Sequence, residues 1–442
     1  MDGGVLRCDD GGENLEIVAR GFRNPWDITM DSGFNWLGTD NDQSEGDRVF
    51  VPFFGAHFGW NHPWSSHWST ETHAPTAPVS GPLFEGSGTG VIFCMSPQFP
   101  PEYRGTFLVN DWLSKKTYLW RPEWRGALMR PEGGAFTPFI EGGSSLFRPT
   151  DLEFGPDGAL WVLGWSSGYG AEYEDGELSN EGRIYRIVWK DAMPPESSLA
   201  GKSLDTMTLD ELIRDFDSPL PVRRIDAQDE LVRRGAGVTQ PILDRLSDRS
   251  LTENQETWSI WTLGRMPEAT ALAGYLHEIL LSNDTEWVNR QVQAVRILSY
   301  RANQLQQTDR LLDSMRLALG HTQPRVRFAA VQAIHEAELK SLVPDLLRLL
   351  EQESDETVYY AGWQSLRILS SQGDLRALMT DPRGSVRRAA LLSLLETHGL
   401  TLGEVREVSR GDTDPEIQTI AKFWIKKIKG CLLYTSDAAD ES

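Results

Sequence analysis

The chain has 442 residues, of which 40% are hydrophobic, and a formal net charge of -21. The length predicts two or three domains, and the acidic excess argues against nucleic acid or an anionic membrane surface as a partner. No run of 18 apolar residues occurs, so we expect no membrane span.

Residues 1–192 predict a β-rich domain. Short apolar runs recur between clusters of Gly, Pro, Asp and Asn, at residues 3–9, 14–21, 89–95, 105–112, 116–122, 159–165 and 182–189. Short strands separated by frequent turns are typical of a sandwich, a barrel or a propeller.

An internal repeat favours the propeller. The segment Phe22–Asp27 (FRNPWD) recurs 125 residues later as Phe147–Asp151 (FRPTD), and each copy is followed by an apolar run, a turn and a strand that contains Trp. This separation fits about three blades of roughly 40–50 residues each. We therefore predict three or four blades of four antiparallel strands, in an open arc with an exposed edge.

The composition changes after a Pro- and Ser-rich linker at residues 193–207. From residue 208 to 430, turns alternate with helix-period apolar patterns, and their anchors recur at spacings of 38, 32, 28 and 31 residues: Val288, Val326, Val358, Val386 and Ile417. This pattern resembles HEAT repeats, which stack helix pairs into an α-solenoid. We expect few contacts between these helices and the propeller.

Residues 431–442 (CLLYTSDAADES) fit no repeat and resemble the translation of a sequencing adapter. We expect this tail to be an artefact of the gene sequence, packed against nothing and without secondary structure tied to the solenoid.

Four motifs resemble those of the soluble quinoprotein sugar dehydrogenases: RNP at 23–25, TDNDQ at 39–43, GDRVF at 46–50 and FGWNHPW at 58–64. The resemblance covers residues 1–190 and implies a six-bladed β-propeller that binds pyrroloquinoline quinone (PQQ) and calcium. Together with the HEAT repeats, the chain is similar to large bacterial membrane-bound dehydrogenase proteins, which often add a c-type haem domain. No C-x-x-C-H haem motif occurs here. The resemblance implies a fragment without the earlier blades.

Arg23 and Asn24 are the candidate catalytic pair. A guanidinium group can bind a carboxylate or a quinone oxygen through two parallel hydrogen bonds. The alternative is a pair that only caps the blade turn. The resemblance implies that both residues contact the cofactor and the substrate oxygen, and that the family's catalytic histidine lies in a missing blade.

Asp40, Asp42 and Gln43 are the candidate metal ligands, in an oxygen-rich loop that also contains Asn41. Such a loop suits Ca²⁺, which takes about six to eight oxygen ligands, although a solvated turn is the alternative. The resemblance places Asp42 and Gln43 where the family has Gly and Pro carbonyls on calcium, so this chain departs from the family there.

Lys115 and Arg148 are the candidate cofactor-binding residues, because the resemblance aligns them with cations that pair with PQQ carboxylates. For Lys115 the alternative is a solvated hairpin turn. Arg148 repeats the position of Arg23, so we expect both guanidinium groups at one end of a central funnel. A second family arginine is Thr150 here.

His57, His62, His67 and His73 form a histidine cluster whose spacings fit no single helix face. A zinc site is one interpretation. The alternative that we favour is a hydrogen-bonding role for His57 or His62 near the funnel.

The resemblance thus implies a periplasmic or secreted quinoprotein that oxidises a sugar or another alcohol and binds a partner protein through its HEAT solenoid. Two alternatives stay open. A calcium-dependent propeller hydrolase, such as a lactonase, would need no cofactor-binding cations. A non-catalytic binding propeller on a solenoid scaffold is favoured by the departures at Asp42, Gln43 and Thr150.

Overall fold

The computed structural model describes residues 3–41, 47–64, 75–82, 86–141, 147–165, 173–174, 177–178, 182–190, 202–248, 250–266, 270–282, 288–302 and 309–437. In these residues all strands, from β1 (Gly3–Arg7) to β18 (Arg183–Ile187), precede all α-helices, from α1 (Leu209–Asp215) to α14 (Pro415–Asp437). The predicted change from strands to helices is therefore confirmed. Across the same residues, no helix is both long and apolar enough to cross a bilayer.

Two compact units make up the chain, and each combines segments that are distant in sequence. The first unit comprises Met1–Arg23, Pro52–Val79 and Leu298–Ser442. The second unit comprises Asn24–Val51 and Ser80–Ile297. Both units therefore contain strands from the first half of the sequence and helices from the second half.

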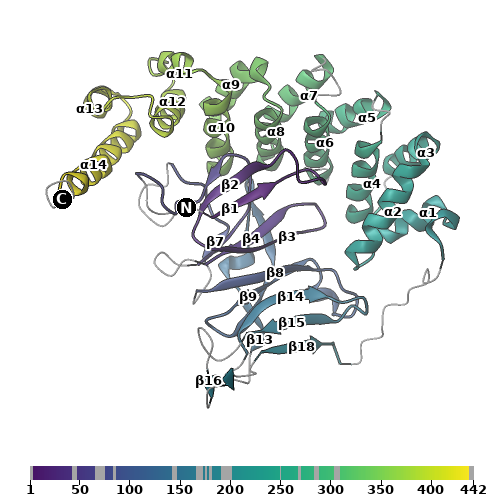
Figure 1. Cartoon of the computed structure of the whole chain (residues 1–442). Helices are drawn as coiled ribbons and strands as arrows, with labels where there is room; N and C mark the ends of the chain where they lie inside the picture. Colours follow the sequence, from purple (N-terminus) through teal and green to yellow (C-terminus); the bar gives the residue numbers. More distant parts are fainter. Residues whose placement is uncertain are drawn as a thin grey trace. The chain divides into compact units, whose positions relative to one another are not determined.

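Three antiparallel sheets follow one another in the second unit (Figure 1). The first sheet contains, in spatial order, β3 (Pro25–Met30), β4 (Trp36–Asp40), β5 (Arg48–Phe50) and β7 (Gly81–Pro82). The second contains β8 (Gly88–Cys94), β9 (Thr106–Asp111), β10 (Lys116–Trp120) and β13 (Thr137–Glu141). The third contains β14 (Pro149–Phe154), β15 (Leu160–Gly164) and β18.

This up-and-down strand order is the order of a propeller blade. Two of the three sheets have the predicted four strands, whereas the described part of the third has three, and none closes on itself. The remaining strands form two hairpins, β11 (Pro122–Arg125) with β12 (Leu128–Pro131) and β16 (Tyr173–Glu174) with β17 (Glu177–Leu178).

Buried apolar side chains join these three sheets face to face. Strand residues alternate between the two faces of a sheet, so β8 and β9 can fill two cores. One core joins the first and second sheets through Leu37, Val49, Val91, Phe107 and Val109. The other joins the second and third sheets through Ile92, Leu108, Leu152, Leu160 and Val162. The sheets therefore stack as consecutive blades would.

Some of the helices of the second unit contact a turn of its first sheet. The helices of this unit are α1, α2 (Pro221–Arg234), α3 (Ala236–Ser247), α4 (Glu253–Arg265), α5 (Thr270–Leu281) and α6 (Val288–Tyr300), which continues into the first unit. The Phe34 ring, in the β3–β4 turn, meets the Trp258 ring edge-on at 5.1 Å. Gln293 donates a 2.7 Å hydrogen bond to the Gly33 carbonyl, and Arg296 donates one of 3.0 Å to the Phe34 carbonyl.

The first unit combines a small sheet with the later helices. The sheet has the order β1-β2-β6, with β2 at Glu16–Phe22 and β6 at Ala56–His57. The helices are α7 (Asp309–Leu319), α8 (Pro324–Glu336), α9 (Val343–Gln352), α10 (Glu356–Leu369), α11 (Gln372–Leu378), α12 (Gly384–Glu396), α13 (Leu402–Gly411) and α14. Figure 1 shows β1 and β2 beside α8 and α10, and Arg7 forms a 2.6 Å ion pair with Glu336.

The prediction of few contacts between strands and helices was wrong. Phe53 meets the rings of Phe328 and Tyr360 edge-on, at 5.2 Å and 5.9 Å. The Phe54 amide donates a 2.7 Å hydrogen bond to Gln332. Aromatic residues that stand in turns of the β-rich half fill the apolar faces of helices, which therefore need these turns to complete their cores.

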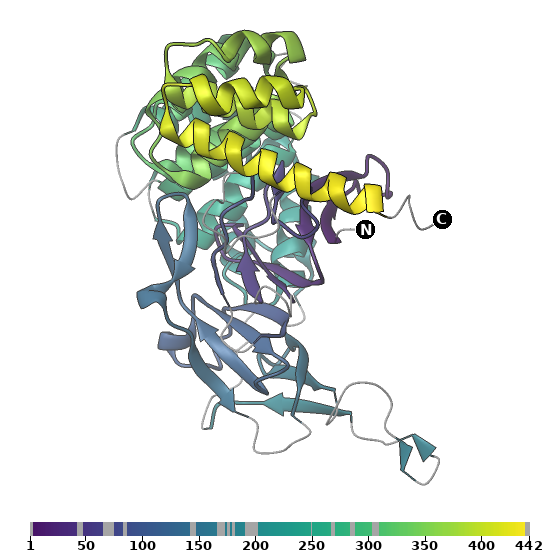
Figure 2. The same ribbon diagram turned by 90° about the vertical axis from the view of Figure 1, so that its left-hand side faces the viewer.

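The prediction that the tail lacks secondary structure tied to the solenoid was also wrong. Helix α14 continues to Asp437 and so includes the first seven residues of the predicted artefact, 431–437, and Figure 2 shows it in yellow as one long helix. The assignment of HEAT repeats and the predicted domain boundaries remain predictions.

Candidate functional site

The two copies of the repeated motif have the same local structure in the second unit. In β3 the pairing with β4 shifts between Pro25 and Asp27, and in β14 the pairing with β15 shifts between Pro149 and Asp151. The shift follows Pro in both copies, where no backbone N–H is available for the ladder. Each Asp then accepts a 2.8 Å hydrogen bond from the next backbone amide.

Strands β3, β8 and β14 bring the two copies together. Trp26 donates a 2.9 Å hydrogen bond from its indole nitrogen to the Thr150 carbonyl. The Asp27 carboxylate also accepts a 2.9 Å hydrogen bond from the Val91 amide on β8. Within the described residues, neither Asp27 nor Asp151 pairs with an arginine, so the aspartates do not neutralise the motif arginines.

Carboxylates gather along these strands. Burial raises the pKa of Asp27, and the charge of Asp151 raises it further. The hydrogen bonds from the Val91 and Ile28 amides act in the opposite direction and do not cancel this rise. Burial likewise raises the pKa of Glu153, with smaller contributions from Asp151 and Asp27. Asp27 and Glu153 are therefore both harder to ionise than exposed carboxylates.

Asp40 lies at the end of β4 and is fully buried. Its Oδ1 accepts a 2.9 Å hydrogen bond from the Asn24 amide, and its Oδ2 accepts bonds of 3.0 Å and 2.7 Å from Arg48. The side chains of Arg48 and Asp40 are 1% and 0% exposed. A calcium ion at Asp40 would have to displace or repel this guanidinium, so the arrangement does not fit Asp40 as a calcium ligand.

The other predicted metal ligands, Asp42 and Gln43, lie outside the described residues. The described residues contain no group of three or more His, Cys, Asp or Glu that could hold a metal ion. Asn24 itself is exposed, and its carbonyl accepts a 3.1 Å hydrogen bond from the Asn41 amide. Its predicted catalytic role stays a prediction.

Arg148 contacts the turn that ends at Lys115. The Arg148 guanidinium lies 4.2 Å from the centroid of the Trp112 ring and 3.4 Å from the Trp112 carbonyl. Trp112 opens the four-residue turn between β9 and β10 that ends at Lys115, whose φ is 59°. Asp111 shapes this turn by accepting hydrogen bonds from the amides of Leu113 and Ser114. Of two cations predicted from separate motifs, Lys115 therefore belongs to this turn and Arg148 packs on it.

Arg23 is exposed in the first unit, with its guanidinium 5.8 Å from the centroid of the Trp60 ring. The equivalent contact of Arg148 with Trp112 shows that both motif arginines stack on a tryptophan from a neighbouring segment. Arg23 and Arg148 belong to different units, so their convergence on one funnel stays a prediction. Neither Trp60 nor Trp112 was identified from the sequence, because nothing in the local pattern links them to a distant arginine.

His57 and His62 pack among helices of the first unit. Their rings are 4.7 Å apart and edge-on. His62 Nε2 lies 2.8 Å from Glu396 on α12, and the His57 amide donates a 3.1 Å hydrogen bond to the Tyr360 hydroxyl on α10. His67 and His73 lie outside the described residues. The described pair thus has hydrogen-bonding partners on the helices, and the zinc interpretation stays untested.

No family model matches the chain, and no curated protein matches it. Similar solved structures include a Thermus thermophilus protein described as an oxidoreductase (glucose dehydrogenase), which is 18% identical with a TM-score of 0.30 over 39% of this chain and 47% of that one. The PQQ-bound aldose sugar dehydrogenase of Streptomyces coelicolor is 16% identical with a TM-score of 0.30 over 42% and 51%. The YibA protein of Escherichia coli is 14% identical with a TM-score of 0.32 over 50% and 94%. The matched part thus spans about half the length of either dehydrogenase.

Proposed function

We propose that the β-rich part of this chain belongs to a quinoprotein that oxidises a sugar or another alcohol with PQQ, and that the helices are a HEAT-type module for protein interaction. The observation that carries the proposal is the contact of Arg148 with the turn that ends at Lys115. Arg148 stacks on Trp112, which begins the turn that Lys115 ends. An arginine stacked on an aromatic ring, with a lysine in the same turn as that ring, suits a planar ligand with several carboxylates.

The residues fit PQQ and calcium unequally. Among the described residues the Lys115 ammonium has no ion-pair partner, so it can accept a ligand carboxylate without breaking an internal pair. When bound, PQQ would supply a quinone that accepts hydride from the alcohol carbon. Arg148 and Lys115 would orient the cofactor by its carboxylates, and Arg23 and Asn24 would orient the substrate oxygen. We derive no step through calcium, because Asp40 is committed to Arg48.

A titration of the intact protein with PQQ, followed by calorimetry, tests this proposal. Arg148→Ala and Lys115→Asn should each weaken binding roughly tenfold or more, because each removes a hydrogen bond between charged groups. Asn is chosen at position 115 because it tolerates the positive φ of that residue.

Arg186→Ala is the matched control. Arg186 also lies over a tryptophan ring, 5.9 Å from the Trp161 centroid, but it already pairs with Asp157. Its removal should leave PQQ affinity unchanged. If the intact protein does not bind PQQ, the dehydrogenase proposal is rejected.

A non-catalytic binding propeller is the second candidate, and the buried Asp40–Arg48 pair favours it. Asp40 is a described residue of the predicted calcium loop, and its carboxylate is already paired with the Arg48 guanidinium. An assay of lactone hydrolysis by the same intact protein tests the calcium-dependent hydrolase. Hydrolysis that requires calcium but not PQQ would support this function.

A further inference from the structure

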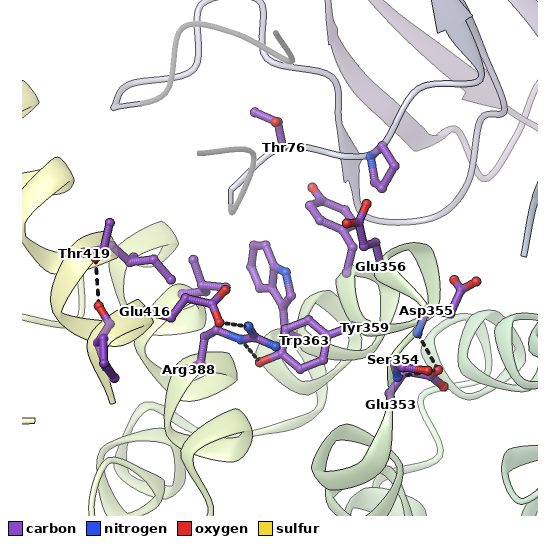
Figure 3. A pocket seen from close by; sticks show the side chains of 15 residues that line it. Thr76, Glu353, Ser354, Asp355, Glu356, Tyr359, Trp363, Arg388, Glu416 and Thr419 are labelled. Atoms are coloured by element: carbon purple, nitrogen blue, oxygen red, sulfur yellow. Dashed lines mark hydrogen bonds and ion pairs between the residues drawn. The ribbon is translucent and has the colours of Figure 1, made fainter. Parts of the chain in front are cut away.

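A pocket of about 620 Å³ opens among the helices of the first unit, and none of the residues discussed above as cofactor ligands lines it. Its wall is formed by α10, α12 and the start of α14, and by the segment that contains Thr76 and Pro78 (Figure 3). This volume lies within the usual range for ligand sites, about 300–1,000 Å³. We call it the α10–α14 pocket.

Aromatic rings of α10 line this pocket. Tyr359, Tyr360 and Trp363 all contribute to the wall, and the Tyr360 and Trp363 rings meet edge-on at 5.2 Å. Burial raises the pKa of Tyr359 to about 12, so its hydroxyl stays protonated at neutral pH. The aromatic wall is therefore uncharged and can pack against the apolar stem of a ligand.

Carboxylates outnumber cations around these rings. Arg388 is the lining cation, and it is held by the Tyr359 ring at 4.0 Å, by the Tyr359 hydroxyl at 2.8 Å and by Glu416. Glu353 is held by Arg327 through bonds of 2.7 Å and 2.8 Å. Glu356, by contrast, has no ion-pair or hydrogen-bond partner for its carboxylate among the described residues.

The helix termini at this pocket do not favour an anion. The N-terminus of α10 is capped by Asp355, which accepts hydrogen bonds from the amides of Thr357 and Val358. At the start of α14, Asp414 accepts one from the Glu416 amide. The positive ends of both helix dipoles are thus already matched by carboxylates of the chain, and the charge left over in the pocket is negative.

Trp363 supplies an unused hydrogen-bond donor. The residue is 1% exposed and lines the pocket, and its indole N–H has no acceptor among the described residues. Figure 3 shows the indole nitrogen on the side of the ring that faces Tyr359 and Glu356. This N–H is not among the buried polar atoms that lack a partner, and it lines the pocket, so a ligand carbonyl at this place would take the position of a water molecule as its acceptor.

The chain itself shows how the Tyr360 hydroxyl of α10 binds a peptide carbonyl. The Tyr360 hydroxyl donates a 3.4 Å hydrogen bond to the Pro75 carbonyl, and the Ala77 amide donates one of 2.8 Å to the His57 carbonyl. Thr76 and Ala77 are buried on this surface. An aromatic hydroxyl on α10 therefore already binds a backbone carbonyl of a Pro-containing segment, next to the unused donor of Trp363.

We propose that the α10–α14 pocket binds an extended, lysine- or arginine-bearing peptide segment of a partner protein. A backbone carbonyl of that segment accepts the Trp363 N–H, and its cationic side chain packs its apolar stem on the Tyr359 and Trp363 rings and places its charge at Glu356. The proposal rests on the interaction role proposed for the helices and does not depend on PQQ.

Fluorescence polarisation with two blocked heptapeptides tests the proposal on the full chain. One peptide carries two lysines beside proline and leucine, and the other carries glutamate in place of each lysine. The lysine peptide should bind, and more weakly as salt rises, whereas the glutamate peptide should not. Equal binding of both peptides overturns the proposal.

Two variants identify the residues involved. Glu356→Gln should weaken binding of the lysine peptide about two- to fivefold, the usual range for an exposed ion pair. Trp363→Phe keeps a ring and removes the donor, and it should cost about three- to tenfold. Because Trp363 is a core residue, Glu356→Gln decides the outcome if the tryptophan variant fails to fold.

Glu407→Gln is the matched control, since Glu407 is an exposed carboxylate on α13 that does not line the pocket. Its affinity for the lysine peptide should equal that of the unaltered chain. An equal loss in both glutamine variants would mean attraction by overall charge and would overturn the site. N-acetyl-lysine amide is then added as a competitor. If it displaces the lysine peptide at an equal concentration, a single lysine side chain explains the binding, and the proposed peptide site is overturned. Binding of PQQ is measured separately, so either proposal can fail alone.

Discussion

Asp40 shows how one side chain changes the interpretation of a loop. An Asp in an oxygen-rich loop predicts a metal ligand, but this carboxylate is buried against Arg48 at 2.7 Å. The sequence contained the signal, because Arg48 stands in the next apolar run, eight residues after Asp40. A buried guanidinium needs a carboxylate partner, and Asp40 is the residue opposite it in the β4–β5 pairing. Residue type alone could not distinguish the two roles.

His335 leads to a prediction about how folding stability depends on pH, again from a single residue. Burial, aided by the charge of Arg367, lowers the pKa of His335 to about 4, from an ordinary value of 6.5. The unfolded chain therefore binds a proton between these two values while the folded chain does not, so folding stability must fall as the pH drops from 6.5 towards 4.

The size of this effect can be measured by urea unfolding at two pH values. Between pH 7.5 and pH 5, the free energy of unfolding should fall by about 2 kcal/mol less in His335→Gln than in the unaltered chain. His398→Asn, which alters an exposed histidine at a positive φ, is the control and should keep the full pH dependence. An unchanged pH dependence in His335→Gln would show that this histidine is protonated as easily in the folded state as in the unfolded state.

At the scale of elements, the duplicated motif was the most informative part of the sequence. The copies at Pro25 and Pro149 produce the same shift in strand pairing, because the same Pro-x-Asp spacing creates it. The third sheet still has three described strands where four were predicted. Short outer strands carry weak patterns, since β7 and the hairpin strands β16 and β17 each have only two residues.

Gly90 on β8 tests the close approach of the sheets. A Cβ atom at this position would lie 2.8 Å from the Asp151 Cα and 2.8 Å from the Leu152 side chain on β14. Because backbone cannot yield as a flexible side chain can, Gly90→Ala should destabilise the second unit by about 1–3 kcal/mol, measured as a lower urea midpoint.

Gly237→Ala, on α3, is the control for Gly90→Ala. No atom lies within 4 Å of a Cβ at Gly237, and alanine is the better helix former, so stability should stay equal or rise. A Gly90→Ala chain as stable as the original would mean that β8 and β14 are not in this contact in solution.

At the scale of the whole molecule, the sequence predicted the order of strands and helices but not how they combine. Apolar periodicity shows that an element has a face to bury, and it does not say which distant segment covers that face. Phe34 and Phe53 are examples, because each lies outside any strand. Their role in packing against the helices is seen only from their ring contacts with Trp258 and Phe328. Both units are built from such pairs, drawn from the two halves of the sequence.

Cleavage of the chain between its strands and helices therefore should not separate them. A site-specific protease sequence placed within residues 195–201 cuts the chain into a strand fragment and a helix fragment. Each unit contains part of both fragments, so the two pieces should co-elute from a sizing column at the position of the intact chain. Phe34→Ala with Phe53→Ala removes the aromatic contacts of one turn residue from each unit and should promote dissociation after the cut, while the uncut double variant still elutes as one species. Two separate peaks from the cut but otherwise unaltered chain would instead restore the predicted picture of independent domains joined by a linker.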